Sequence, residues 1–153
     1  MYSREEASRL RQEFWTAFGL YMQPILSADG EKVNWINYKT GEKGLAFRMQ
    51  ADNHSASIAI ELTQRDAGIR QLYFEQLLEL KNLLHGELGE EWTWESETMD
   101  ETGRVLSRVF TERHDISVFK KDDWPALISF FKPRIVALDA FWSGARYTFE
   151  RLR

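Results

Sequence analysis

The sequence contains no cysteine among its 153 residues, and this absence removes several kinds of chemistry. Without cysteine there is no disulfide framework, no catalytic thiolate and no zinc site built on cysteine ligands. The three histidines, His54, His85 and His114, stand far apart, and no two have the i, i+4 spacing of a helical zinc site. We therefore expect no bound metal ion and no other cofactor.

Long apolar runs are also missing. No stretch approaches the roughly 18 apolar residues that a membrane-spanning helix needs. The first six residues, 1–6, are charged where a secretion signal would be basic and then apolar. Together these features predict a protein that does not enter the membrane and stays in the cytoplasm.

The composition that remains is that of a globular protein. Hydrophobic residues make up 43% and charged residues 29% of the chain, which is too apolar for disorder. The length fits one domain, so residues 1–153 are expected to form a single domain. The net charge of −4 argues against a broad cationic surface, so binding of nucleic acid is not favoured.

Apolar residues at spacings of three and four predict helices. Ser3 and Glu6 form a capping box that opens a helix over 4–22. Apolar residues from 69 to 84 cover much of a helical circumference, so this helix is expected among the most buried elements. A last helical region starts near Pro125, and Pro133 is expected to break or kink it near residue 131.

Alternating apolar and polar residues predict strands between these helices. Three strands over 33–38, 45–50 and 56–62 are separated by short turns, which favours an antiparallel meander. Two more strands are expected, one around residues 92–94 and one over 105–110, and a short edge piece near 116–119. The fold class is therefore α+β: a mostly antiparallel sheet of about five strands, in the order helix, three strands, helix, two strands, helices, with the helices packed on the sheet.

Charge is distributed unevenly along this chain. Residues 86–102 contain seven acidic residues and no basic one. We interpret this segment as a solvated edge that resists sheet-to-sheet association, with an acidic docking face or a cation site as the alternative. The basic residues of the C-terminal region spread around their helix and form no single stripe.

A search for catalytic motifs finds neither a glycine-rich phosphate loop nor a nucleophile elbow. The order of elements resembles that of restriction-endonuclease-like nucleases, which carry an acid on the second strand and (D/E)-x-K on the third to bind a metal and activate water. Here Glu61 on the third strand is followed by Leu62 and Thr63, with no lysine. Arg48 occupies the second strand, and Asp52 lies in the turn beyond it. Glu61 and Asp52 are thus nuclease-like candidates without the motif, and an enzyme is not favoured.

Aromatic residues are abundant, at 14% of the chain. Exposed aromatic side chains that form a contiguous patch mark an interface. Trp35, Tyr38 and Trp94 are the candidate binding residues. The sequence therefore favours a non-catalytic binding or interaction module, with a protein partner or a second copy of the chain as its ligand. The alternative is a degenerate nuclease-like or nucleic-acid-binding accessory protein.

Three segments carry a resemblance to a known family. Residues 3–15 (SREEASRLRQEFW), residues 35–41 (WINYKTG) and the region from 123 to 135 (DWPALI through KPRI) resemble a bacterial domain-of-unknown-function family (number four-two-six-eight). The resemblance covers nearly the whole chain and implies a bacterial intracellular protein. In that family the domain stands alone or follows another domain, which in some members looks nuclease-like. The resemblance supplies no activity and no catalytic residues.

Overall fold

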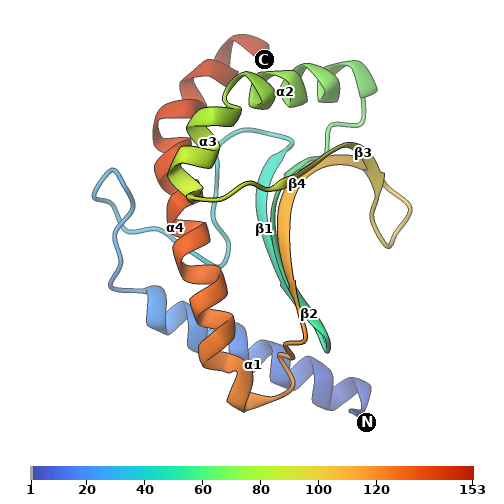
Figure 1. The fold of residues 1–153 in the computed structure, drawn as a ribbon, viewed down its shortest axis with the longest axis vertical. Helices are drawn as coiled ribbons and strands as arrows, with labels where there is room; N and C mark the ends of the chain where they lie inside the picture. Colours follow the sequence, from blue (N-terminus) through green and yellow to red (C-terminus); the bar gives the residue numbers. More distant parts are fainter. Residues whose placement is uncertain (1) are drawn as a thin grey trace.

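Four antiparallel strands and four α-helices build the fold in the computed structural model, which describes residues 2–153 (Figure 1). In chain order the elements are α1 (Arg4–Met22), β1 (Leu45–Ala51), β2 (Ser55–Leu62), α2 (Ala67–Glu79), α3 (Lys81–Leu88), β3 (Thr93–Met99), β4 (Val105–His114), a 3-10 turn (Lys121–Asp123), α4 (Trp124–Phe149) and a final 3-10 turn (Glu150–Leu152). The α+β class is confirmed.

The sheet has the order β1-β2-β4-β3 and consists of two hairpins joined along β2 and β4. The β1–β2 hairpin turns at residues 53–54, where the Asp52 N–H donates to the Ser55 carbonyl at 2.8 Å. The β3–β4 pairing slips between Glu95 and Thr98. Such a bulge bends the strand, and Figure 1 shows the β3–β4 turn standing away from the helices.

The prediction of about five strands is wrong by one, because residues 33–38 are not a strand. The Asn34 side chain accepts hydrogen bonds from the backbone N–H groups of Ile36 and Asn37, both at 3.1 Å. Local bonds of this kind give the backbone an alternative to a ladder. Residues 116–119 form no strand either. The observed order is helix, two strands, two helices, two strands, helix.

The helices lie where the sequence predicts them, but they are interrupted at a different place. The Ser3 hydroxyl caps α1 by accepting from the Glu6 N–H at 3.1 Å, as predicted. The single helix expected from 69 to 84 is divided at Leu80 into α2 and α3. Of the expected break or kink near 131, the break is absent, since α4 continues through Pro133. Buried side chains on both sides of the proline, among them Phe131 and Ile135, anchor the helix to the core there.

One hydrophobic cluster joins the inner face of the sheet to the helices. In Figure 1, α3 and α4 lie on the same side of the sheet, while α1 crosses one end of it and α2 the other. Ile58 and Ile60 of β2 are fully buried, as are Phe14 of α1 and Phe131 of α4. No helix within residues 2–153 has the length and apolar character to cross a membrane.

Candidate functional site

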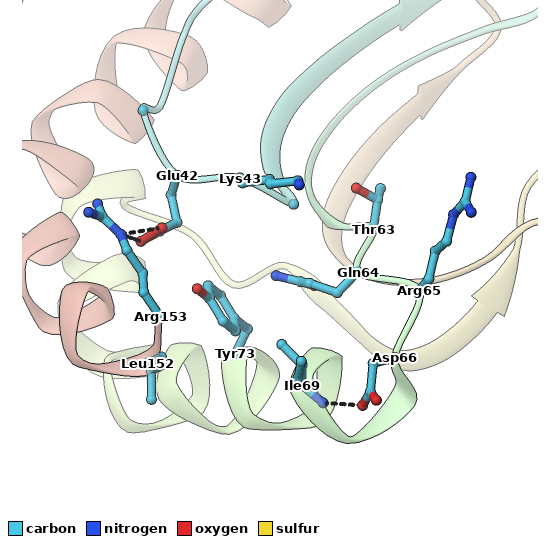
Figure 2. A pocket seen from close by; sticks show the side chains of 12 residues that line it. Glu42, Lys43, Thr63, Gln64, Arg65, Asp66, Ile69, Tyr73, Leu152 and Arg153 are labelled. Carbon is cyan, nitrogen blue, oxygen red and sulfur yellow. Dashed lines mark hydrogen bonds and ion pairs between the residues drawn. The ribbon is translucent and has the colours of Figure 1, made fainter.

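A pocket of about 1010 Å³ opens where four segments distant in sequence meet (Figure 2). The turn 41–44 before β1 forms one wall, and the link 63–66 between β2 and α2 faces it. The first turns of α2 and the final residues 152–153 complete the lining. We call this hollow the β1–α2 pocket.

An ion pair closes one end of the β1–α2 pocket. The Arg153 Nε donates to both carboxylate oxygens of Glu42, at 2.9 and 3.2 Å. The Glu42 side chain is only 4% exposed, whereas that of Arg153 is 58% exposed. The hydrogen bond and the negative charge of Glu42 raise the pKa of the Arg153 guanidinium. Burial of the adjacent Tyr73, together with the Glu42 charge, raises the pKa of the Tyr73 phenol.

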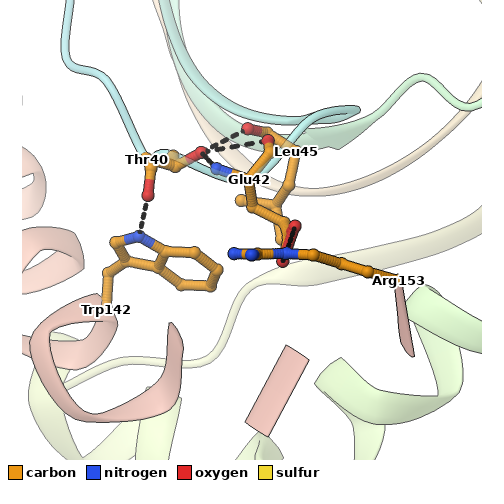
Figure 3. A network of polar contacts seen from close by, with 5 residues as sticks. All are labelled: Thr40, Glu42, Leu45, Trp142 and Arg153. Carbon is orange, nitrogen blue, oxygen red and sulfur yellow. Dashed lines mark hydrogen bonds and ion pairs between the residues drawn. The ribbon is translucent and has the colours of Figure 1, made fainter. Parts of the chain in front are cut away.

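A set of hydrogen bonds centred on Thr40 holds the turn that carries Glu42 (Figure 3). The Thr40 hydroxyl donates to the Leu45 carbonyl at 2.7 Å and accepts from the Glu42 N–H at 3.1 Å. The indole Nε1 of Trp142 on α4 donates to the Thr40 carbonyl at 2.7 Å. The turn is therefore tied both to its own strand and to the long helix.

The opposite side of the pocket contains an unsatisfied amide. Neither the nitrogen nor the oxygen of the Gln64 side-chain amide has a hydrogen-bond partner within residues 2–153, and both atoms are sheltered from water. The amide lies against Gly44, where an added Cβ would stand 2.8 Å from the Gln64 nitrogen. Gly44 also has a φ of +82°, which other residues rarely adopt. Glycine at this position therefore makes room for the amide.

Glu61, one of the two nuclease-like candidates, lies on the outer face of the sheet among cations. Its side chain is 10% exposed, and Arg48 approaches it at 3.8 Å. The residue directly opposite on β4 is Arg108, which pairs with Glu95 at 2.8 Å. Burial raises the pKa of the Glu61 carboxyl, and nearby arginines, Arg48 foremost, oppose this.

Asp52, the other candidate, lies at the far end of the same hairpin and pairs with Arg11 at 2.6 Å. Five residue steps separate the Ala46–Glu61 pair from the Ala51–Ala56 pair beside the turn. At about 3.4 Å per step, the two carboxylates stand roughly 17 Å apart, too far to share one metal ion. Within residues 2–153, no group of three or more histidine, aspartate and glutamate side chains is placed to hold a metal ion.

The three aromatic candidates all take part in packing within the chain. Trp35 is 3% exposed and donates from its indole nitrogen to the Ile25 carbonyl at 2.9 Å. Tyr38 is half-buried, and its hydroxyl donates to Asp139 at 2.5 Å. Burial and this bond raise the pKa of the Tyr38 phenol. Trp94 is also half-buried and meets Phe74 edge to face, 5.8 Å between ring centres.

A different set of apolar residues is exposed. Between 41% and 52% of each side chain is open to solvent in Ile69, Leu72, Leu78 and Leu83. The helical segment expected to be among the most buried therefore lies at the surface, because only one side of α2, with Tyr73, Phe74 and Leu77, reaches the core. The apolar positions of this segment extend over more of the helical circumference than one core contact covers, so some of them stay exposed.

These observations define the class of the protein as an α+β fold with a four-stranded antiparallel sheet, whose outer face carries no helix in the described chain. A family model described as "Domain of unknown function (DUF4268)" matches residues 10–146. The chain belongs to this family, which confirms the resemblance seen in the sequence. No curated protein and no solved structure matches the chain.

Proposed function

We propose that this chain is a non-catalytic interaction module that binds a basic amphipathic protein segment through the exposed side of α2 and α3. The observation that carries the proposal is the half-exposed set Leu72, Leu78 and Leu83, which we call the α2–α3 face. Exposed apolar side chains favour association, since burying them releases free energy in proportion to their area.

The spacing of these residues suits an elongated partner. Leu72, Glu75 and Leu78 follow one another at intervals of three along α2, so they are neighbours on its exposed side. Leu83 is the half-exposed leucine of α3, beyond the break at Leu80. Exposed leucines thus recur along both helices, a length that an extended or helical segment can follow.

The charge of the α2–α3 face favours a cationic partner over a second copy. Glu75 and Glu79 are both exposed, and neither enters an ion pair within the described part of the chain. Antiparallel pairing of two α2 helices would bring Glu75 of each copy against the other, and like charges in contact oppose binding. Lysine or arginine on the partner would instead complement them.

The alternative of a nuclease-like accessory protein receives no support from its own candidates. Glu61 is surrounded by arginines, and Asp52 is engaged by Arg11 at the other end of the hairpin. Arg48 pairs with Glu61 itself and with Glu101, and Arg108 pairs with Glu95.

Fluorescence anisotropy with a labelled helical peptide of leucine and lysine tests the interaction. We expect saturable binding that is at least about tenfold tighter than binding of the matched leucine–glutamate peptide. The double substitution Leu72→Asn with Leu78→Asn should weaken binding by about tenfold or more. Glu75→Lys should weaken it as well and reduce its dependence on salt.

Matched controls use exposed residues elsewhere. Leu20 and Leu26 are 66% and 50% exposed, so Leu20→Asn with Leu26→Asn removes as much surface leucine without touching α2. This control should bind the basic peptide as the unaltered chain does. Equal losses in both double variants, or no preference between the two peptides, would refute the proposal.

A further inference from the structure

The β1–α2 pocket has a chemistry that the proposed interaction does not use. Its lining combines three cationic side chains, those of Lys43, Arg65 and Arg153, with two acidic ones. The pocket is thus cationic in a chain whose net charge is −4. One of the two acids, Glu42, is already neutralised by Arg153. The other, Asp66, accepts the Ile69 N–H at 2.9 Å as the cap of α2.

Two of the cations remain available to a ligand. Lys43 and Arg65 are exposed, and neither enters an ion pair within residues 2–153. In Figure 2 the Lys43 side chain extends from the turn 41–44 and the Gln64 side chain from the link 63–66, and both residues line the pocket. Two loops of the lining therefore supply an ammonium group, a hydroxyl and an amide.

The Gln64 amide is a second observation, independent of the charges. Buried polar groups in native proteins nearly always have a partner, so an amide with neither its donor nor its acceptor used calls for an explanation. A ligand oxygen that accepts from the Gln64 NH₂ would satisfy the donor. The amide now lies against Gly44, which has no Cβ to meet it, and a rotation of the Gln64 side chain would present the NH₂ to the ligand.

The remaining walls are apolar. Ile69 and Leu152 line the pocket together with the ring of Tyr73. A bare inorganic anion would leave these walls exposed to water, whereas an apolar group joined to the anion would cover them. A hollow of about 1010 Å³ also has room for far more than one phosphate group.

We propose that the β1–α2 pocket binds an organic anion, a carboxylate or phosphate joined to an apolar or aromatic body. Lys43, Thr63 and the Gln64 amide hold the anionic group, and Ile69, Tyr73 and Leu152 contact the body. Arg65 at the rim attracts the ligand, and the Glu42–Arg153 pair closes the far end. This site is separate from the α2–α3 face, and it stands on different observations.

Backbone amide NMR titration with four small probes tests this assignment. Phenyl phosphate and benzoate carry the two anions on the same apolar body, inorganic phosphate lacks the body, and benzylamine reverses the charge. We expect saturable shifts from phenyl phosphate, benzoate or both, at residues 41–44, 63–66 and 69–73. The tighter of the two identifies the preferred anion. Inorganic phosphate should bind at least about tenfold more weakly, and benzylamine should produce no saturable shifts there.

Two variants and one control locate the binding group. Lys43→Met should weaken binding of the preferred anion by about tenfold, and Gln64→Leu by about fivefold or more. Lys32→Met removes an exposed lysine that does not line this pocket and should leave the affinity unchanged. The proposal would be overturned if neither organic anion bound, if benzylamine bound equally well, or if the shifts were confined to other residues. It would also be overturned if Lys43→Met kept full affinity or if Lys32→Met lost as much affinity as Lys43→Met.

Discussion

The guanidinium of Arg134 on α4 binds the carboxylate of Glu90 through two parallel hydrogen bonds, from Nε at 2.9 Å and from a terminal nitrogen at 2.8 Å. Glu90 lies in the link between α3 and β3, and it also accepts from the Trp92 indole nitrogen at 2.7 Å. The pair therefore ties the long C-terminal helix to the start of the edge strand. Two-point pairing of this kind fixes orientation as well as adding energy.

We expect Glu90→Gln to lower the free energy of unfolding by about 1 kcal/mol near neutral pH, since the pair is partly exposed and screened by solvent. Burial raises the pKa of Glu90, but the bonds from Arg134 and Trp92 outweigh it and leave the pKa lowered. This stabilisation is present above the usual pKa of about 4.5 and is lost as the pH falls through the lowered pKa. Urea unfolding at several pH values measures it. A variant as stable as the parent at neutral pH would contradict the prediction.

Glu61→Gln should instead raise the free energy of unfolding near neutral pH. Burial raises the pKa of Glu61 despite its arginines, so ionisation of this carboxyl is less favourable in the folded chain than in the unfolded one. The protonated Glu61 contributes its whole stabilisation below the usual pKa of 4.5, which is that of the unfolded chain. This stabilisation is lost as the pH rises through the raised pKa of the folded chain. The variant should therefore be more stable than the parent near neutral pH. The difference should shrink in acid.

The same unfolding series, with Glu97→Gln as an exposed control on β3, checks the Glu61 prediction. The control should show little change at any pH. Destabilisation by Glu61→Gln near neutral pH would contradict the prediction, because it would mean that the pairing of Glu61 with Arg48 and the charges of the other nearby arginines outweigh the effect of burial.

Gly44→Ala should destabilise the fold more than Gly103→Ala. Both glycines have a positive φ, +82° and +84°, so both substitutions carry a backbone penalty of about 1 kcal/mol. Only at Gly44 would the new methyl group meet another side chain, that of Gln64 at 2.8 Å, since nothing lies within 4 Å at Gly103. The difference in thermal stability between the two variants measures this contact. Adding Gln64→Ala to Gly44→Ala should recover part of the loss, and equal effects at both glycines would contradict the account.

Tyr38→Phe should lower the free energy of unfolding by about 1–3 kcal/mol, because it removes a hydrogen bond from the buried Asp139. Asp139 would then retain the bond that it accepts from the Ala28 N–H at 2.7 Å. Tyr147→Phe is the matched control, since Tyr147 is 58% exposed and its hydroxyl contacts only the exposed Arg146 within the described residues. Chemical denaturation compares the two, and an equal loss in both would rule out a specific role for the Tyr38–Asp139 bond.

Local patterns in the sequence determined much of this fold. The Ser3 capping box placed the start of α1, and period-two alternation placed β1, β2 and β4, because both signals act between residues close in the chain. The same alternation misled at residues 33–38, where Asn34 bonds to its own backbone neighbours. The sequence alone therefore predicted the α+β class of the fold correctly, but it did not predict the number of strands.

Tertiary structure alone decided which side chains meet. The β1–α2 pocket joins residues 41–44 to 63–66 and 152–153, and no local pattern relates these segments. The hairpin register separated Glu61 from Asp52, and the limited contact of α2 with the core left Leu72 and Leu78 in solvent. Periodicity states how apolar a helix is on each side, but exposure depends on what other elements cover it, and that is settled only when distant parts of the chain pack together.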